Sequence, residues 1–257
     1  MTGEVRVEFR DAVVHVTLAH PGRRNALTYD MYDALAAALR DAGHDPAVRA
    51  VVLRGADGAF AGGTDIRHLA DLRTGEDGVV YEARMRAVQE TLLDLRVPVV
   101  AVVEGACVGG GLVLAALSDL VVCTPDARFG SPIARTIGNT LSATSLARLH
   151  ACLGRRRTAQ MLLTGRLLDA DEALAAGFVT AVLPPADLDG WLEEVLAAVR
   201  ACAPLSLWSF KEVERRLDAA AAAVPVDDVY RRVYGSADFR EGVEAFLAHR
   251  PPRYEGR

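Results

Sequence analysis

Apolar positions in the first half of the chain form short alternating or continuous runs, which predict a series of strands. Residues 5–9 and 14–18 alternate apolar and polar positions and predict a hairpin of half-buried strands. Continuous apolar runs at 48–53, 98–103 and 119–123 predict buried strands. A helical stretch separates the run at 14–18 from the run at 48–53. Glycine-rich turns follow the runs at 48–53 and 98–103. The pattern therefore predicts an α/β fold built from repeating ββα turns rather than one alternating parallel sheet.

Apolar residues recur at helical spacing in several longer segments. Thr28 suits the N-cap of an amphipathic helix that runs to about residue 42. A long helix is predicted from residue 79 to 95, and beyond residue 140 the chain is mostly helical, with a short strand at 179–182. Pro204 opens a helix that Pro225 ends. The other helices predicted in this part of the chain cover 142–152, 155–163, 169–176 and 187–202.

Composition narrows the classes of protein to consider. The 257 residues fit one large domain or a domain with an appendage, and 51% hydrophobic with 25% charged residues is ordinary for a soluble globular enzyme. A net charge of −5 gives no support to nucleic-acid or anionic-membrane binding. Four cysteines without a CxxC pair, and no apolar targeting run at the N-terminus, predict reduced thiols in a cytoplasmic protein without a metal site.

Three consecutive glycines, 109–111, follow the apolar run at 98–103 and precede a helical stretch of small residues. Glycine in such number costs backbone entropy, so it is expected where the backbone approaches something closely. Amides at a helix start lack partners within the helix, and the helix dipole favours negative charge there. A backbone site for an anion is one interpretation, and a tight turn or close helix packing is the other. The glycine spacing fits neither a P-loop nor a dinucleotide fingerprint.

A second strand, glycine turn and helix occurs at residues 58–66, where Thr64 or Asp65 suits the N-cap. Two such turns, each with a free N–H group, can point at one oxygen atom. That arrangement is typical of a site for a transient oxyanion.

The segments 60–66 and 105–111, with Asp119 behind the second, resemble the paired signature of the enoyl-CoA hydratase/isomerase (crotonase) family. The resemblance extends from residue 5 to about 254, and the residues 236–247 are similar to the closing helix of that family. It implies a crotonase-like ββα spiral core over 1–200.

Over residues 201–257 the resemblance implies a C-terminal helical region for subunit association. By resemblance the protein is a homo-oligomer, a trimer or a dimer of trimers. No nucleic-acid or membrane partner is expected.

The resemblance also implies the chemistry. In the family, two peptide N–H groups hold a thioester carbonyl as it becomes an enolate, and the matching donors here are Thr64 and Gly110. Coenzyme A enters as part of the substrate, and no separate cofactor is expected. Arg23 and Arg24 are candidate phosphate contacts, although a plain solvated loop is an alternative. Lys211 matches a position near the adenine end of the coenzyme, or is an exposed surface lysine. The remaining acyl-CoA positions that the resemblance assigns are Ala26, Ala61, Gly63, Asp65, Ile66, Val113 and Ile133.

The sequence departs from the family where proton transfer is needed. Hydratases carry glutamates at the positions of Val113 and Ile133, and neither of these side chains can carry a proton. His68 has a suitable intrinsic pKa of about 6.5, whereas Arg135, in the polar stretch 134–140, can stabilise charge but is a poor base. Asp65 is expected to cap a helix rather than to act as a base.

Tyr81 and Glu82, like His68, are expected to be exposed. Three interpretations of the function remain open. It is a hydratase or isomerase of altered site, an enzyme of other enolate chemistry such as decarboxylation or retro-aldol cleavage, or a non-catalytic acyl-CoA binder. A serine hydrolase is disfavoured because the chain has no Gly-x-Ser-x-Gly elbow.

Overall fold

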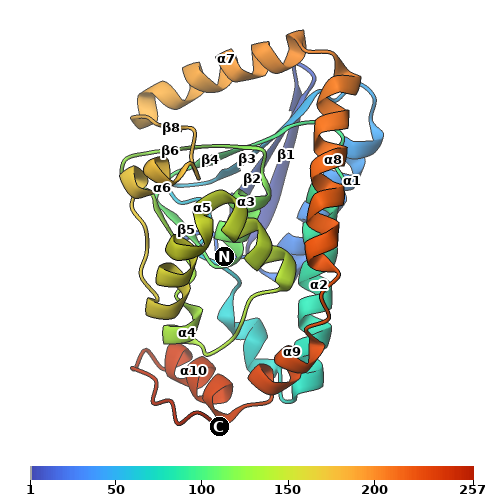
Figure 1. The fold of residues 1–257 in the computed structure, drawn as a ribbon. Helices are drawn as coiled ribbons and strands as arrows, with labels where there is room; N and C mark the ends of the chain where they lie inside the picture. Colours follow the sequence, from blue (N-terminus) through green and yellow to red (C-terminus); the bar gives the residue numbers. More distant parts are fainter. Residues whose placement is uncertain (1) are drawn as a thin grey trace.

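The computed structural model describes residues 2–257, apart from the side chains of 220–222. Its main sheet has six strands, and the first two pair antiparallel as the predicted hairpin. The first strand is largely exposed, whereas the second is largely buried. All later neighbours pair parallel. In spatial order the strands are β1 (Glu4–Arg10), β2 (Val13–Ala19), β3 (Ala50–Gly55), β4 (Val99–Val103), β6 (Leu120–Cys123) and β8 (Ala181–Val182) (Figure 1).

A second, smaller layer of strands lies beside the main sheet. It contains β5 (Ala106–Val108) and β7 (Arg128–Gly130), which pair parallel. Single bridges add Ala61 beside Cys107, and Leu27 beside Thr64. Successive main-sheet strands β2, β3, β4 and β6 are thus each followed by a segment of this second layer and then by a helix. The repeating ββα turns are confirmed, and because each turn returns the chain in the same direction, the main sheet is parallel beyond β2.

The predicted helices of the core are present, and their ends follow local sequence signals. Thr28 accepts a hydrogen bond from the amide of Met31 at 3.2 Å and so begins the first helix. Gly154, at φ 72°, kinks a long helix where the sequence predicted a break between two. The predicted helices are α1 (Tyr29–His44), η1 (Ile66–Asp71), α2 (Gly75–Leu93), α3 (Gly110–Leu117) and α5 (Ala143–Thr164), and the short α4 (Ile133–Thr136) is an addition that was not predicted.

The main sheet is buried on both faces. Alternate strand residues such as Val51 and Leu53 face the larger core, which α1, α2, α3 and α5 cover. Val52 and its neighbours face a smaller core closed by α7 (Leu188–Ala201), which contributes Leu192 and Leu196 (Figure 1). Near-continuous apolar runs are the expected sequence of strands buried in this way.

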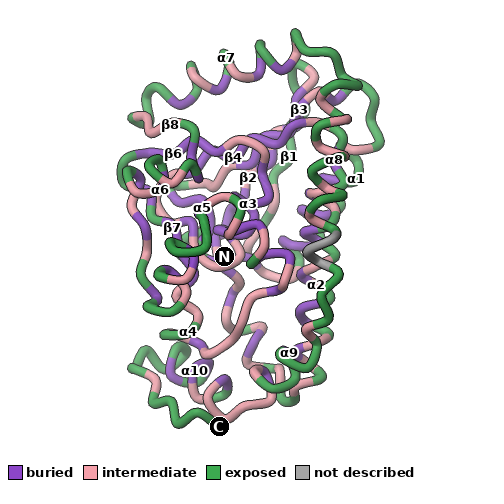
Figure 2. The backbone as a smooth tube through the Cα atoms, viewed as in Figure 1, coloured by how far each residue is buried: buried purple, intermediate pink, exposed green. Residues whose placement is uncertain are grey.

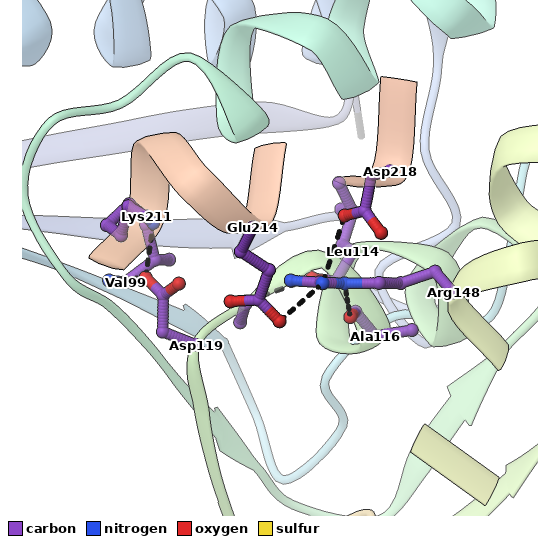
Figure 3. A network of polar contacts seen from close by, with 9 residues as sticks. Val99, Leu114, Ala116, Asp119, Arg148, Lys211, Glu214 and Asp218 are labelled. Atoms are coloured by element: carbon purple, nitrogen blue, oxygen red, sulfur yellow. Dashed lines mark hydrogen bonds and ion pairs between the residues drawn. The ribbon is translucent and has the colours of Figure 1, made fainter. Parts of the chain in front are cut away.

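The C-terminal helices pack back onto the same chain. A long helix, α8 (Pro204–Ala222), lies along α5, where the guanidinium of Arg148 contacts both Glu214 and Asp218 at 3.0 Å (Figure 3). The next two helices pack against α2 and η1. The remaining elements are α6 (Ala170–Ala176), η2 (Pro185–Asp187), α9 (Asp227–Tyr234) and α10 (Ala237–Leu247). Within residues 2–257, no helix combines the length and the apolar character that crossing a membrane requires.

Candidate functional site

The two glycine turns predicted from the sequence lie side by side in the second strand layer. The amide of Ala61 donates to the carbonyl of Ala106, and the amide of Val108 donates back to Ala61, both at 2.9 Å. Gly63 has φ 102° and Gly109 has φ 54°, a backbone region that favours glycine. A Cβ on Gly109 would lie 3.5 Å from the Cα of Gly63, so the two backbones are in van der Waals contact.

This contact brings residues 64 and 110 together. Gly110 is the first residue of α3, and a Cβ on it would lie 3.5 Å from Oγ1 of Thr64. Among the hydrogen bonds formed within residues 2–257, neither the Thr64 amide nor the Gly110 amide has an acceptor. Two unpaired donors next to each other can bind one oxygen that carries negative charge.

Both residues line a cavity of about 730 Å³, within the size range of small-molecule sites. Arg23 and Arg24 are exposed side chains of its lining. Val113 and Ile133 also line it, so its walls at these two positions are apolar. The other residues that the sequence analysis assigned to the site and that line the cavity are Ala26, Gly63, Asp65 and Ile66.

The loop that carries Arg23 and Arg24 is hydrogen-bonded to the start of the first glycine turn through the buried side chain of Asn25. Asn25 accepts from the amide of His20 at 2.9 Å and donates to the carbonyls of Ala56 and Ala59 at 2.8 and 2.7 Å. The carbonyl of Arg24 also accepts from the amide of Gly62 at 2.7 Å. The loop that carries the arginines is therefore held in place by the same turn that supplies Thr64.

Asp65 is a helix cap, as expected, and it does not suit the role of a base. Its carboxylate accepts from the amide of Arg67 at 3.1 Å and forms an ion pair with that guanidinium. The hydrogen bonds from Arg67 hold the pKa of the Asp65 carboxyl below its ordinary value, although burial opposes them. The carboxylate is thus already paired.

The two side chains that the sequence analysis offered as catalytic groups, His68 for proton transfer and Arg135 for charge stabilisation, do not line the cavity. His68 is half-buried and stacks on the ring of Tyr29, with ring centroids 4.3 Å apart. Arg135 is exposed and packs against Gly165. Neither belongs to the described cavity lining, so the structure does not bring them together with Thr64.

Ala61 and Lys211 also lie outside the cavity lining. Ala61 is fully buried and serves the bridge between the glycine turns. Lys211 lies on α8 and forms an ion pair of 2.5 Å with Asp119 (Figure 3). The carboxylate of Asp119 also accepts a hydrogen bond from the amide of Val99. Within this chain Lys211 therefore joins α8 to the main sheet.

The expectation that Tyr81 and Glu82 are exposed is wrong. Their exposed fractions are 8% and 5%, and both line the cavity from α2, together with Met85 and Gln89 one and two turns later. The arginines at 84 and 86, close to Glu82 in the sequence, gave the segment a polar character. The spacing of Tyr81, Met85 and Val88 was the available signal of an inward face.

A chain of three hydroxyl groups runs past the two free amides. Tyr32 and Thr64 share a hydrogen bond of 2.9 Å between their side-chain oxygens, and Thr64 and Tyr81 share one of 3.3 Å. Burial, assisted by the nearby Glu82 carboxylate, raises the pKa of Tyr32 to about 12 even though its hydrogen bond to Thr64 opposes the shift. Tyr32 is therefore a neutral phenol that retains its proton at physiological pH.

Glu82 lies next to this hydroxyl chain and is held from the C-terminal region. The hydroxyl of Tyr234, on α9, donates a hydrogen bond to its Oε1. Burial raises the pKa of Glu82 to about 7, although the bond from Tyr234 and the charge of Arg86 lower it. The cavity thus contains a carboxyl group that the sequence analysis did not assign to it.

Other buried polar atoms complete the lining. Oγ of Ser131 and Oδ1 of Asn139 belong to residues that line the cavity, and neither atom has a hydrogen-bond partner among the described residues. Phe246 and His249, from the C-terminal region, also contribute to the lining. The C-terminal region therefore helps to build the cavity through residues that the sequence analysis did not assign to it, whereas Lys211, the residue of this region that it did assign, lies outside the lining.

Comparison with known proteins identifies the group to which this architecture belongs. The family model described as enoyl-CoA hydratase/isomerase matches residues 8–257. The "Probable enoyl-CoA hydratase" of Rhizobium meliloti is 33% identical over 257 residues, covering 98% of this chain and 97% of its own. The crystal structure of an enoyl-CoA hydratase/carnitine racemase from Magnetospirillum magneticum has a TM-score of 0.80 at 32% identity, covering 100% of this chain and 97% of its own.

A methylmalonyl-CoA decarboxylase in complex with 2-nitronate-propionyl-CoA has a TM-score of 0.89 at 25% identity, covering 99% of each chain. The likeness extends over the glycine turns, the cavity and the C-terminal helices alike, since each of these matches covers nearly the whole chain. The chain belongs to the enoyl-CoA hydratase/isomerase family.

Proposed function

We propose that the cavity binds an acyl-CoA and that the amides of Thr64 and Gly110 stabilise the thioester oxygen as the substrate becomes an enolate. The observation that carries this proposal is the pair of unpaired amides, contributed by adjacent glycine turns, at one cavity wall. Charge that develops on the thioester oxygen is stabilised by fixed donors, and one such donor is typically worth about 2.7–4 kcal/mol of the barrier.

The rest of the lining suits the two ends of such a substrate. Arg23 and Arg24 are exposed and provide cations for the phosphates of coenzyme A. Val113, Leu114 and Ile133 provide apolar walls for the acyl chain. Coenzyme A then arrives as part of the substrate, and the proposed reaction uses no further cofactor.

The same walls argue for chemistry at the α-carbon rather than hydration. Adding water across a double bond needs a group that activates the water and a group that protonates the α-carbon. Val113 and Ile133 offer neither. Removing or returning one proton at the α-carbon needs a single acid–base group beside the two donors.

Exchange of α-protons with solvent tests this proposal. Butyryl-CoA in deuterated water should lose α-protons in the presence of the protein, as followed by mass spectrometry. A Cβ on Gly110 would meet the hydroxyl oxygen of Tyr32 at 2.3 Å, so Gly110→Pro and Gly110→Ala are both made in a Tyr32→Phe background.

Pro and Ala share that Cβ, but Pro lacks the N–H donor and is tolerated at the first helical position. The Pro variant should exchange at least 100-fold more slowly than the Ala variant, while free CoA binds both alike. Equal exchange by the two folded variants would contradict the role of Gly110.

Decarboxylation is the second candidate, and the apolar cavity favours it. A carboxylate on the α-carbon that enters an apolar pocket is destabilised relative to neutral CO₂, and the electron pair left behind passes to the thioester oxygen. The methylmalonyl-CoA decarboxylase compared above has the same fold over nearly its whole length. Release of CO₂ from malonyl-CoA or methylmalonyl-CoA supports this candidate. Binding without exchange or CO₂ release supports an acyl-CoA binder instead.

We further propose that the protein self-associates through α8. Its outer side exposes large apolar side chains, including Leu205, Phe210, Val213 and Leu217, which are 77%, 71%, 59% and 69% exposed. Over residues 204–219 the helix is largely exposed (Figure 2). Such a stripe on one helix is typical of an interface between subunits. Light scattering should show a trimer or hexamer, and Phe210→Ser with Leu217→Ser should shift it toward monomer. A wild-type monomer would contradict this assignment.

A further inference from the structure

We propose that Glu82 is the group that exchanges a proton with the α-carbon, and that Tyr234 positions it. This inference rests on the proposed function, since it concerns the same cavity and the same thioester. It assigns proton transfer to helix α2 and to the C-terminal helix α9, although the family resemblance pointed to positions 113 and 133.

The surroundings of Glu82 distinguish it from the other carboxylate in the cavity lining. Asp65 is paired with Arg67 and caps η1. Glu82 is 5% exposed, and the ion pairs of the described residues give it no cationic partner. A buried carboxyl that forms no ion pair can switch between its neutral and charged forms, because no opposite charge in direct contact locks the ionised form.

Tyr234 is built into α9 so that it reaches Glu82. A Cβ on Gly78 would lie 2.3 Å from the Cβ of Tyr234, so α9 approaches α2 at a position that lacks a side chain. The Tyr234 ring packs edge-on against Phe239 at 4.9 Å between centroids and is fully buried. Glu82 is one turn beyond Gly78 on α2, which places its carboxylate within reach of the Tyr234 hydroxyl.

This arrangement leaves one carboxylate oxygen for chemistry. Oε1 of Glu82 accepts from Tyr234, whereas Oε2 has no hydrogen-bond partner among residues 2–257. Glu82 itself belongs to the cavity lining, next to Tyr81, whose hydroxyl contacts Thr64. The free oxygen and the two free amides thus serve the same cavity.

The charge environment supports a group that works near neutral pH. Burial is the largest cause of the raised pKa of Glu82, about 7, and the hydrogen bond from Tyr234 and the charge of Arg86 moderate it. A general base is most effective when its pKa is close to the working pH. The titratable and charged side chains that face Glu82 are Arg86 and Tyr81 from α2, Tyr32 from α1, and Tyr230 and Tyr234 from α9.

The step that follows is balanced without a further reactant. The α-carbon–hydrogen bond breaks, its electron pair moves into the enolate and onto the thioester oxygen, and the proton passes to Oε2 of Glu82. Reprotonation reverses each movement. If CO₂ is lost instead, the carbon–carbon electron pair forms the same enolate, and neutral Glu82 delivers its proton to the α-carbon.

Glu82→Gln tests the proposal with little change in shape. This variant keeps an acceptor for Tyr234 but cannot accept or deliver a proton at this position. Exchange of the α-protons of butyryl-CoA should fall by at least about 100-fold, the lower end of the usual contribution of a general base, while the affinity for butyryl-CoA changes by less than about threefold. Glu90→Gln, on the exposed side of the same helix, should exchange at the wild-type rate.

Tyr234→Phe tests the positioning role through the pH profile. Wild-type exchange should rise with pH as Glu82 ionises, with a midpoint near its pKa of about 7. The Tyr234 hydroxyl stabilises the ionised carboxylate, so its loss should move the midpoint to higher pH and slow exchange below it. A purely structural role would lower the rate at every pH without moving the midpoint.

The outcomes separate this inference from the proposed function. Exchange that persists in Glu82→Gln, but that in the Tyr32→Phe background is kept with Gly110→Ala and lost with Gly110→Pro, would overturn the role of Glu82 and leave the amide site intact. A wild-type protein that binds butyryl-CoA without exchanging it, and releases no CO₂ from a malonyl thioester, would overturn both. Loss of exchange in Glu82→Gln with retained binding supports the assignment.

Discussion

Gly78 on α2 and Tyr234 on α9 are in direct contact, with the tyrosine side chain occupying the space where a side chain at position 78 would be. Gly75 shows the same relation one turn earlier, since a Cβ there would lie 2.2 Å from the carbonyl oxygen of Arg231. Two glycines spaced by three residues therefore give α2 a smooth side for α9. This contact holds Tyr234 beside Glu82.

Gly78→Ala should therefore destabilise the protein, although alanine favours helices. Overpacking of this kind typically costs about 1–3 kcal/mol. Gly190→Ala, in α7, is the matched control because nothing lies within 4 Å of a Cβ there. The control should leave stability unchanged or raise it by up to about 1 kcal/mol. Urea unfolding midpoints measure both, and equal midpoints for the two variants would be inconsistent with the close contact.

The raised pKa of Glu82 predicts how stability depends on pH. The carboxyl binds its proton more tightly in the folded protein, at about 7, than in the unfolded chain, at 4.5. The contribution of this carboxyl to the free energy of unfolding is therefore fully present below pH 4.5 and is lost as pH rises to about 7. By that pH the free energy of unfolding of wild type should have fallen by up to about 3 kcal/mol relative to that of Glu82→Gln.

Unfolding free energies of wild type and Glu82→Gln, measured between pH 5 and 8, test this relation. Glu90→Gln should follow the wild-type curve, because the Glu90 side chain on the same helix is exposed to solvent. A constant difference between wild type and Glu82→Gln over this range would show that Glu82 has an ordinary pKa.

Arg148 should be a main anchor of α8. Its guanidinium is buried and donates to the carbonyl of Ala116 at 3.1 Å as well as to Glu214 and Asp218 (Figure 3). Arg148→Ala removes all three bonds and should cost about 2 kcal/mol, since hydrogen bonds to charged groups are worth about 1.5–3 kcal/mol. Arg157→Ala, exposed on the same helix, should change stability by less than about 0.5 kcal/mol. Thermal unfolding measures both variants, and an equal change in melting temperature for the two would contradict the role of Arg148 in holding α8.

Hydration should require the carboxylates that positions 113 and 133 lack. Wild type should leave crotonyl-CoA unhydrated, and Val113→Glu combined with Ile133→Glu should introduce measurable hydration, at a cost in stability because two carboxyls enter an apolar wall. Loss of the enoyl-thioester absorbance follows the reaction, and each single variant is the control. Rapid hydration by wild type would contradict the restriction to α-carbon chemistry.

The parts of the fold and site that depend on local sequence were predictable. Thr28 as a cap, the hairpin, and the glycine turns around Thr64 and Gly110 each follow from neighbouring residues. Glu82 was not predictable in this way, because its burial depends on Tyr234, which is 152 residues later in the chain. A glutamate among charged neighbours resembles a surface residue until the helix that covers it is known.

His68 illustrates the opposite case. Its chemistry suited proton transfer and it follows Thr64 closely in sequence, but the short η1 helix directs it to the ring of Tyr29 instead of the cavity. Nearness along the chain is a poor guide to a site whose walls come from α2, α3 and the C-terminal helices.

The thioester carbonyl itself reports most directly on the central claim that two backbone amides hold it. Isotope-edited infrared difference spectra of butyryl-CoA, carbon-13 labelled at the carbonyl, measure that bond in the bound state without requiring turnover. In the Tyr32→Phe background, the carbonyl band should shift to lower frequency with Gly110→Ala and shift less with Gly110→Pro. Identical band positions in the two complexes would show that the Gly110 amide does not contact the thioester oxygen.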